Sequence, residues 1–235
     1  MYDRPEIMNA NDKLWALIRH ELGYGPEALS RQADMWSIWR SPDLLLAQSC
    51  GLPFRHSLHK QVQIVGTPDY GVEACPPGYY RSVIIARRNS STDLGDLDNL
   101  RFAYNERLSQ SGWAAFWDHV PEGSAPRALV QTGAHAASAL AVYKGQADIA
   151  SLDAVTWNLI QKHEAYSDSL MIISQTRPTP GLPYITSASQ DAAEIFEAVK
   201  TAVHKLDQKS KHLLQIRDFV LIAPEAYLAE PLPPA

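Results

Sequence analysis

One segment decides the fold, residues 100–153: LRFAYNERLSQSGWAAFWDHVPEGSAPRALVQTGAHAASALAVYKGQADIASLD. Its hydrophobic pattern predicts three strands, at 100–105, 128–132 and 147–153. Helices are predicted after the first two strands, one beginning near Trp113 and one over 136–144 that ends at Gly145. Strands that alternate with helices at this spacing indicate βαβ units and a parallel sheet.

Polar residues follow each of these predicted strands. In a parallel sheet the carboxyl ends of the strands and the N-termini of the following helices face one crevice. The residues expected to converge there are Ser109, Gln110, Ser111, His135 and Asp153. The first N–H groups of a helix lack intrahelical partners, and the helix dipole favours negative charge beside them. The segment therefore predicts an anion site, in which Gly112 would let the backbone approach the ligand closely.

Each of these residues also has a purely structural interpretation. Ser109 or Ser111 could cap the helix that follows. Asp153 could hold a cation, or it could cap a helix that begins at Ala154. His135 could donate to a ligand or face solvent in the first turn of its helix. The sequence leaves these alternatives open.

Three further polar or aromatic residues are candidates for the same site. Asn105 ends an apolar strand, which favours a position at the crevice. Gln48 ends the predicted strand 43–48 and would face either the crevice or a turn. Tyr80 lies near the start of the predicted long strand 79–87 and could lie in the core or in the cleft, although strand aromatics are more often in the core.

Composition excludes several classes of protein. A length of 235 residues suits one large domain or two lobes of about 100 residues. The net charge of −5 argues against a nucleic-acid surface. No apolar run reaches the roughly 20 residues of a membrane span. Charged residues within the first 20 positions exclude a signal peptide there, which predicts a cytoplasmic protein or a trimmed form of a secreted one.

No metal, cofactor or catalytic motif is predicted. Cys50 and Cys75 could form one bridge or remain free thiols, and neither lies in a metal-ligand cluster. His56 and His59 are close in sequence, but no cysteine or carboxylate cluster joins them. The sequence has no P-loop, no GxGxxG fingerprint and no GxSxG elbow.

The order of the segments predicts two lobes. Residues 90–98 are polar, and 176–183 are rich in proline and glycine, so we place crossings near Ile84 and Thr179. Lobe one would contain 1–84 and 180–235, and lobe two would contain 85–179. Two crossings permit hinge closure around a ligand. Residues 1–3 have the character of the end of a strand whose start is missing or very short.

Several short motifs, in this order, resemble one known family. They are Asp43-Leu44-Leu45-Leu46-Ala47-Gln48-Ser49-Cys50-Gly51, Tyr80-Arg81-Ser82-Val83, Ser109-Gln110-Ser111-Gly112, Thr132-Gly133-Ala134-His135, Gly145-Gln146-Ala147-Asp148 and Pro180-Gly181-Leu182-Pro183. The chain resembles the phosphate/phosphite/phosphonate substrate-binding proteins of ABC importers. The resemblance implies an α/β, two-lobed type II periplasmic-binding-protein fold, each lobe a mostly parallel sheet flanked by helices.

The resemblance also implies roles for particular residues. In that family a serine-rich loop and the histidine of a Gly-x-His segment grip the anionic group, which corresponds to Ser109, Ser111 and His135. A tyrosine that matches Tyr80 closes over the ligand. The family usually has threonine where Gln110 stands, so the amide would suit an anion of another shape. Asp153 could hold the amine of an aminophosphonate.

The leading prediction is a solute-binding protein that closes on a small polar or anionic, phosphonate- or phosphate-like ligand between two lobes. It would serve the membrane subunits of an ABC importer, without inserting into the membrane or binding nucleic acid. The resemblance implies a periplasmic location. Two alternatives stay open: an enzyme on the same fold that remodels a pyrimidine or porphyrin precursor, and a cytoplasmic ligand sensor.

Overall fold

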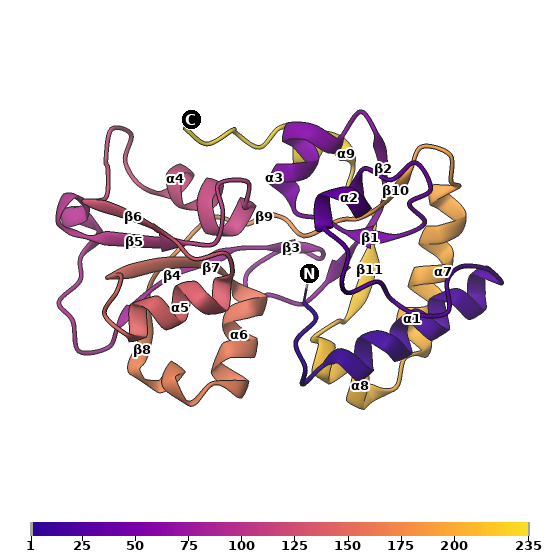
Figure 1. Cartoon of the computed structure of the whole chain (residues 1–235), viewed down its shortest axis with the longest axis horizontal. Coiled ribbons are helices and arrows are strands. Elements are labelled where there is room, and N and C mark those ends of the chain that lie inside the picture. Colours follow the sequence, from indigo (N-terminus) through magenta and orange to yellow (C-terminus); the bar gives the residue numbers. More distant parts are fainter. Residues whose placement is uncertain (1, 235) are drawn as a thin grey trace. The chain divides into compact units, whose positions relative to one another are not determined.

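The computed structural model describes residues 2–234 (Figure 1). The chain divides into two compact units. Unit 1 contains the described residues up to Tyr79 together with Pro180–Ala229, and unit 2 contains Tyr80–Thr179 together with the residues from Glu230 onward. Two short strands, β3 (Tyr79–Tyr80) and β9 (Thr179–Pro180), pair with each other where the chain passes between the units.

These boundaries differ from the predicted ones in two places. Ile84 lies inside a strand of unit 2, so this unit begins earlier than the sequence analysis placed it. The sequence analysis treated 79–87 as one continuous stretch, so it gave no signal for a break between Tyr79 and Tyr80. The residues from Glu230 onward group with unit 2 and not with lobe one. The Glu230 carboxylate accepts hydrogen bonds from both terminal nitrogens of Arg177, at 3.1 and 2.6 Å.

Unit 1 has one four-stranded sheet, in the order β1-β10-β2-β11. Its strands are β1 (Ala47–Gln48), β2 (Val62–Asp69), β10 (Tyr184–Ser187) and β11 (Asp218–Val220). Its helices are α1 (Met8–Leu22), α2 (Met35–Trp39), α3 (Gly51–Pro53), α7 (Ala192–Lys205), α8 (Gln208–Leu214) and α9 (Pro224–Leu228). Helix α3 continues into a helical turn at Phe54–Leu58. All neighbouring strands are antiparallel, so the predicted mostly parallel sheet is wrong for this unit.

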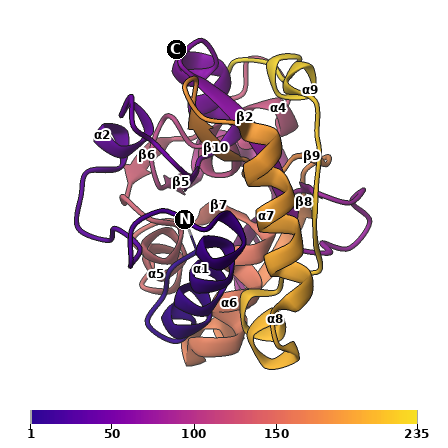
Figure 2. The ribbon, with the colours of Figure 1, turned by 90° about the vertical axis from the view of Figure 1, so that its right-hand side faces the viewer.

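Helix α7 packs against β2 and β11. Helix α1 packs against α7 in turn, and the two helices lie side by side in Figure 2. The apolar residues of α7 recur with the 3.6-residue period of a helix and so share one face. Ile195, Val199 and Val203 on this face are fully buried. Asp191 caps the helix by accepting hydrogen bonds from the N–H groups of Ala193 and Glu194.

Two predictions in unit 1 need correction. Only Ala47–Gln48 of the predicted strand 43–48 is paired in the sheet. The sequence analysis also missed α8, which follows α7 after a single break. Asp207 starts α8 by accepting a hydrogen bond from the N–H group of Ser210. The rings of Trp36 and Trp39 meet edge to face at 5.2 Å within a core cluster.

Unit 2 has a five-stranded sheet in the order β6-β5-β7-β4-β8. Its strands are β4 (Ser82–Arg87), β5 (Arg101–Tyr104), β6 (Ala128–Gln131), β7 (Ile149–Asp153) and β8 (Leu170–Gln175). Its helices are α4 (Ala115–His119), α5 (His135–Tyr143) and α6 (Ala154–His163), with helical turns at Leu94–Asn99, Gln110–Ala114 and Ala165–Ser169.

The predicted βαβ block is present, since β5 pairs in parallel with both β6 and β7. The rest of the sheet is antiparallel, because β4 runs against β7 and β8. The sheet of unit 2 is therefore mixed, where a mostly parallel one was predicted. Hydrophobic periodicity reports burial and not strand direction, so the orientation of β4 could not be predicted from it.

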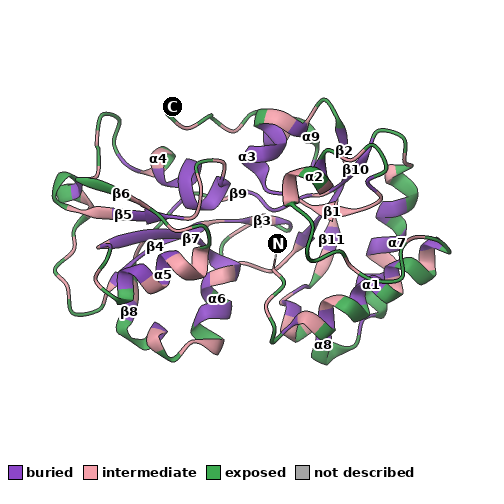
Figure 3. Cartoon of the chain, viewed as in Figure 1, coloured by how far each residue is buried: buried purple, intermediate pink, exposed green. Residues whose placement is uncertain are grey.

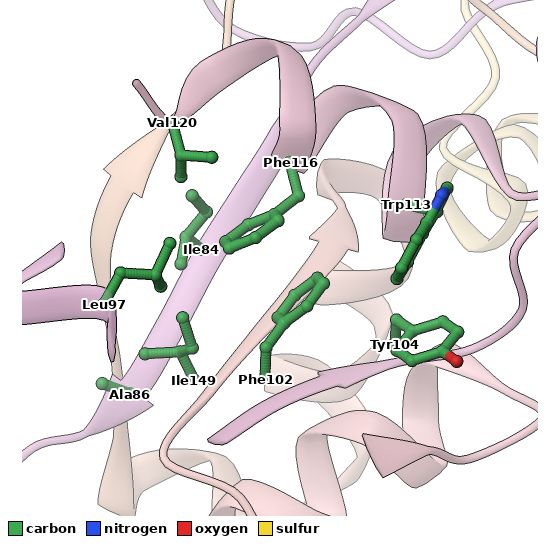
Figure 4. Close-up of a cluster of buried hydrophobic side chains, with 9 residues drawn as sticks. All are labelled: Ile84, Ala86, Leu97, Phe102, Tyr104, Trp113, Phe116, Val120 and Ile149. Atoms are coloured by element: carbon green, nitrogen blue, oxygen red, sulfur yellow. The ribbon is translucent and has the colours of Figure 1, made fainter. Parts of the chain in front are cut away.

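An aromatic cluster forms the core between β5 and the helix that follows it (Figure 4). The rings of Phe102 and Phe116 stack with centroids 3.7 Å apart, and Trp113 packs beside Tyr104 at 4.6 Å. Figure 3 shows the inner strands β4 and β7 buried along their length. Each fully buried large apolar side chain contributes about 1.5–3 kcal/mol to folding.

An ion-pair network fixes the start of β5 against the start of β7. Both carboxylate oxygens of Asp148 accept from the Arg101 guanidinium, at 2.9 and 2.8 Å, and the backbone N–H of Arg101 donates to the same carboxylate at 2.9 Å. Arg87 adds a bond at 3.3 Å. These contacts hold the pKa of Asp148 far below its usual range, mainly through the Arg101 hydrogen bonds.

Candidate functional site

The first part of the site is the loop after β5. Asn105 directly follows this strand, and Ser109 starts the helical turn Gln110–Ala114 that continues into α4. The turn is wide, because the N–H group of Ala114 donates to the carbonyl of Ser109 at 3.0 Å, five residues back along the chain. The Ser109 hydroxyl oxygen accepts from the N–H group of Gly112 at 3.0 Å. The capping alternative is therefore confirmed for Ser109.

The second part is the loop between β6 and α5. Thr132 and Gly133 donate their backbone N–H groups to the carbonyls of Tyr104 and Asn105, at 2.9 and 3.0 Å. Gly133 has a φ of 82°, a left-handed conformation that suits glycine. These bonds join the two loops and place His135 as the first residue of α5.

The third part is the junction of β7 and α6. Asp153 caps α6 by accepting a hydrogen bond from the N–H group of Thr156 at 2.8 Å, so its capping alternative is confirmed. The other carboxylate oxygen of Asp153 lies 3.5 Å from Nε2 of His135. One carboxylate thus starts a helix and also holds the histidine.

Ser111 completes this arrangement. Its hydroxyl oxygen lies 3.0 Å from Nε2 of His135. Its carbonyl accepts a hydrogen bond from the hydroxyl of Ser151 at 2.7 Å. The sequence analysis did not propose Ser151, although its position two residues before Asp153 on the same strand puts both side chains on one face of the sheet.

Two buried polar atoms in the site have no hydrogen-bond partner among residues 2–234. They are Oδ1 of Asn105 and Nδ1 of His135. Both residues border Gly112, since a Cβ atom at this position would collide with Asn105 Oδ1 and would lie 3.0 Å from Cε1 of His135. Buried polar groups are almost always paired, so these two atoms are free to bond to a ligand that enters beside Gly112.

Burial lowers the pKa of His135 below its ordinary value, and the negative charge of Asp153 together with the Ser151 backbone opposes this effect in part. The imidazole is therefore neutral at neutral pH in the ligand-free chain. The positive ends of α5 and of the helix that begins at Gln110 remain as the local attraction for an anion.

The other predicted residues lie as follows. Gln110 is buried in the same helical turn as Ser111, and Tyr80 is buried at the start of unit 2. Gln48 belongs to β1 of unit 1, where its amide nitrogen donates to the hydroxyl of Tyr70 at 3.0 Å. The structure thus brings Asn105, Ser109, Gln110, Ser111, His135 and Asp153 together in unit 2.

The geometry does not support nucleophilic catalysis by Ser111. In a catalytic triad the serine and the carboxylate approach different nitrogens of the histidine. Here Ser111 and Asp153 both approach Nε2 of His135. Within residues 2–234, no group of three or more His, Cys, Asp or Glu side chains could hold a metal ion. Cys50 and Cys75 are free thiols.

Comparison with known proteins identifies the family. Residues 43–227 match the model of a family described as the periplasmic substrate-binding protein of phosphonate ABC transporters. The chain belongs to this family. Its members bind a small ligand, work with membrane subunits, and are typically periplasmic; the family is one of transport proteins, not of enzymes. No curated protein matches the sequence. None of the described helices could cross a membrane.

Solved structures share the fold of this substrate-binding protein at low sequence identity. PhnD1 from Prochlorococcus marinus, in complex with methylphosphonate, has a TM-score of 0.73 at 16% identity, covering 94% of this chain and 90% of that one. A binding protein component of a phosphonate transporter from Pseudomonas aeruginosa has a TM-score of 0.66 at 18% identity, and the match covers 93% of this chain and 79% of that one. XAC2383 from Xanthomonas citri, bound to ATP, has a TM-score of 0.67 at 16% identity, and the match covers 94% of this chain and 88% of that one.

Proposed function

We propose that this substrate-binding protein takes a small anion of the phosphonate or phosphate class at the site in unit 2. The residues that would hold it are Asn105, Ser109, Gln110, Ser111, His135 and Asp153. The observation that carries the proposal is the pair of buried, unpaired atoms, Asn105 Oδ1 and His135 Nδ1, beside Gly112. Tyr80 and Gln48 remain predicted ligand contacts.

Each group has a definite task in this proposal. The hydroxyl oxygen of Ser109 accepts from Gly112, so its proton is free to point toward an oxyanion. Ser111 and the first backbone N–H groups of the helical turn add further donors. Asn105 presents an acceptor as its buried atom, which suits a protonated oxygen of a phosphonate or phosphate monoanion. The anion itself would be retained without lysine.

His135 would gain a proton when the anion binds. The ring is held at Nε2 by Asp153 and Ser111, so Nδ1 is the atom left for the ligand. A neutral ring that keeps its proton on Nε2 can only accept at Nδ1, whereas an imidazolium donates from both nitrogens. An anion beside Nδ1 therefore raises the pKa of His135. Affinity should fall as the pH rises through the pKa of the ligand-bound state.

The test is calorimetry with methylphosphonate, phosphate, phosphite, a sulfonate, a carboxylate and ATP, after bound molecules are removed by unfolding and refolding. Ser111→Ala and His135→Ala should each weaken binding of the best anion by roughly ten- to a hundredfold, since a hydrogen bond to a charged group contributes on the order of 1.5–3 kcal/mol. Ser124→Ala and His212→Ala are matched controls, because neither side chain makes a hydrogen bond within residues 2–234 and His212 is exposed. Unchanged affinity in both site variants would refute the proposal.

A second measurement isolates the proton. Binding heats taken at neutral pH in two buffers of different ionisation enthalpy report how many protons are taken up. The parent protein should take up more than the His135→Gln variant with the same ligand. The ligand's own titration is common to both proteins and cancels in this comparison. Equal uptake by parent and variant would show that His135 does not gain the proton.

A further inference from the structure

The groups that line the candidate site carry no positive charge in the ligand-free chain. Asp153 contributes a carboxylate whose side chain is only 3% exposed, and burial lowers the pKa of its partner His135, so the imidazole is neutral at neutral pH. Glu106 directly follows Asn105, and burial raises the pKa of its carboxyl group. A cation close to the site would therefore determine how strongly the site prefers negatively charged ligands.

Arg107 is the cation of the loop between β5 and the helical turn Gln110–Ala114. The N–H group of Ser109 donates to the carbonyl of Glu106 at 3.2 Å, which closes a tight turn with Arg107 inside it. Arg107 is two residues from both Asn105 and Ser109, so its Cα atom lies at most about 7.6 Å from each of theirs. This distance is comparable to the Debye length of about 8 Å at physiological ionic strength. The charge of Arg107 is therefore felt at the site.

The side chain of Arg107 is held over an aromatic ring. Its guanidinium carbon lies 4.9 Å from the centroid of the Trp113 ring, and this buried ring packs beside Tyr104 with centroids 4.6 Å apart. Trp113 directly follows Gly112, beside which the ligand is proposed to enter. A stacked guanidinium uses its face, so the N–H donors in its plane are not consumed by the contact. The stack thus fixes a positive charge next to the site.

The charge of Arg107 is not neutralised by a neighbouring carboxylate. Within residues 2–234, no Asp or Glu side chain forms an ion pair with it, and its side chain is exposed. By contrast, Arg87, Arg101 and Arg177 of the same unit each pair with at least one carboxylate. An anion that approaches the loop therefore meets a full positive charge at Arg107.

We propose that Arg107 is a specificity-determining residue of the anion site, which selects negatively charged ligands and speeds their entry from solvent. This inference rests on the proposed function, because it concerns the same site. Arg107 acts through its electric field, and it is not counted among the groups that hold the bound anion. Attraction of this kind raises association rates and weakens as the ionic strength rises.

The size of the effect follows from the separation of the charges. At about 10 Å, the attraction between two unit charges changes an equilibrium constant by about twofold in bulk water and by roughly fifteenfold at the effective dielectric constant of about 20 found near protein surfaces. Removal of the Arg107 charge should therefore weaken the binding of a monoanion by about three- to tenfold at low salt.

The test measures the association rate and the affinity of methylphosphonate, by stopped-flow tryptophan fluorescence and by calorimetry. Both are measured in about 10 mM and about 1 M sodium chloride, where the Debye length is about 30 and 3 Å. Arg107→Gln should lower the rate and the affinity by about three- to tenfold in low salt, and it should match the parent in high salt. Arg107→Lys keeps the charge and should stay within about twofold of the parent.

Arg127→Gln is the matched control, because it removes the same charge from the same unit. Arg127 is exposed and precedes the first residue of β6. Since β5 and β6 are parallel, the start of β6 lies at the opposite edge of the sheet from the loop that holds Arg107. This control should change neither the rate nor the affinity at either salt concentration by more than about twofold.

Three results would overturn the inference. One is a loss in Arg107→Gln that is no larger than the loss in Arg127→Gln at low salt. Another is a loss that persists in about 1 M salt, where charge is screened, and the third is a loss that Arg107→Lys shares. The last two would give Arg107 a structural role over Trp113. Failure of the proposed function is a separate result, in which the parent itself binds no methylphosphonate at either salt concentration, and the inference falls with it.

Discussion

Replacing Asp148 by alanine should destabilise unit 2 by about 2–4 kcal/mol, because a largely buried carboxylate that accepts several charge-assisted hydrogen bonds is removed. Only 16% of the Asp148 side chain is exposed, against 30% for Arg101. Arg87 keeps its bonds to the carbonyls of Val142 and Ala147, at 2.9 and 2.8 Å, so it is not left unpaired. The free-energy cost therefore comes mainly from Arg101, whose backbone N–H and guanidinium both lose a hydrogen-bond partner. Because water can reach part of the guanidinium, it replaces some of the lost hydrogen bonds.

The same carboxylate predicts the direction of a pH effect. The pKa of Asp148 in the folded chain lies below its unfolded value of about 3.9. The carboxylate therefore stabilises the fold above that unfolded value, and the contribution is lost as the pH falls through the folded pKa. Parent and variant should differ most at neutral pH and converge in acid.

Thermal unfolding followed by circular dichroism is the assay, repeated from pH 7 down to pH 3. A loss of 2–4 kcal/mol corresponds to a shift of roughly 5–15 °C in a protein of this size. Asp98→Ala is the matched control, because Asp98 is exposed in the same unit and should shift the melting temperature by little. The ion-pair argument is wrong if Asp148→Ala has the same melting temperature as the Asp98→Ala control. It is also wrong if the difference in melting temperature between parent and Asp148→Ala does not shrink in acid.

Three further predictions test other parts of the chain. Phe116→Ala should cost about 3–5 kcal/mol in urea unfolding, because its ring is fully buried and stacked on Phe102 at 3.7 Å; a loss below 1 kcal/mol would contradict this packing. Tyr227→Phe should cost about 1–3 kcal/mol, because the buried Thr67 hydroxyl loses its 2.6 Å partner, and the double variant with Thr67→Val should recover part of the loss. Gly112→Ala should weaken anion binding at least tenfold with little change in melting temperature, because the new Cβ displaces the Asn105 side chain; retained affinity would place the ligand elsewhere.

The sequence predicted the parts of the fold that hydrophobic period and capping signals report. The block 100–153 forms the parallel strands β5, β6 and β7 with their helices. Strand direction leaves no such trace, so the antiparallel neighbours of β4 and the wholly antiparallel sheet of unit 1 were missed. Pairing also depends on a partner. Residues 43–46 have a strand sequence, yet they border a cavity and are not in a ladder.

At the candidate site, the sequence identified residue types and could not predict which atoms would be free. It offered capping and ligand binding as alternatives for Ser109 and Asp153. Both residues do cap their helices, but this does not exclude binding, because capping uses only one of the Ser109 lone pairs and one oxygen of Asp153. The caps fix where the remaining groups point. Ser151 was overlooked because its contact is with the backbone of Ser111, which no side-chain pattern reveals.

The position of Asp153 sets a constraint on any ligand of this site. A carboxylate beside His135 opposes a second negative charge unless the histidine is protonated, and burial lowers the pKa of His135 in the ligand-free chain. Contact between Nδ1 and a ligand oxygen that carries no proton must therefore be accompanied by proton uptake. A monoanion that carries its own proton avoids part of this cost, because its hydroxyl can donate to Asn105 Oδ1 or to a neutral His135. Selectivity among phosphonates and related oxyanions should thus follow their protonation state as much as their shape.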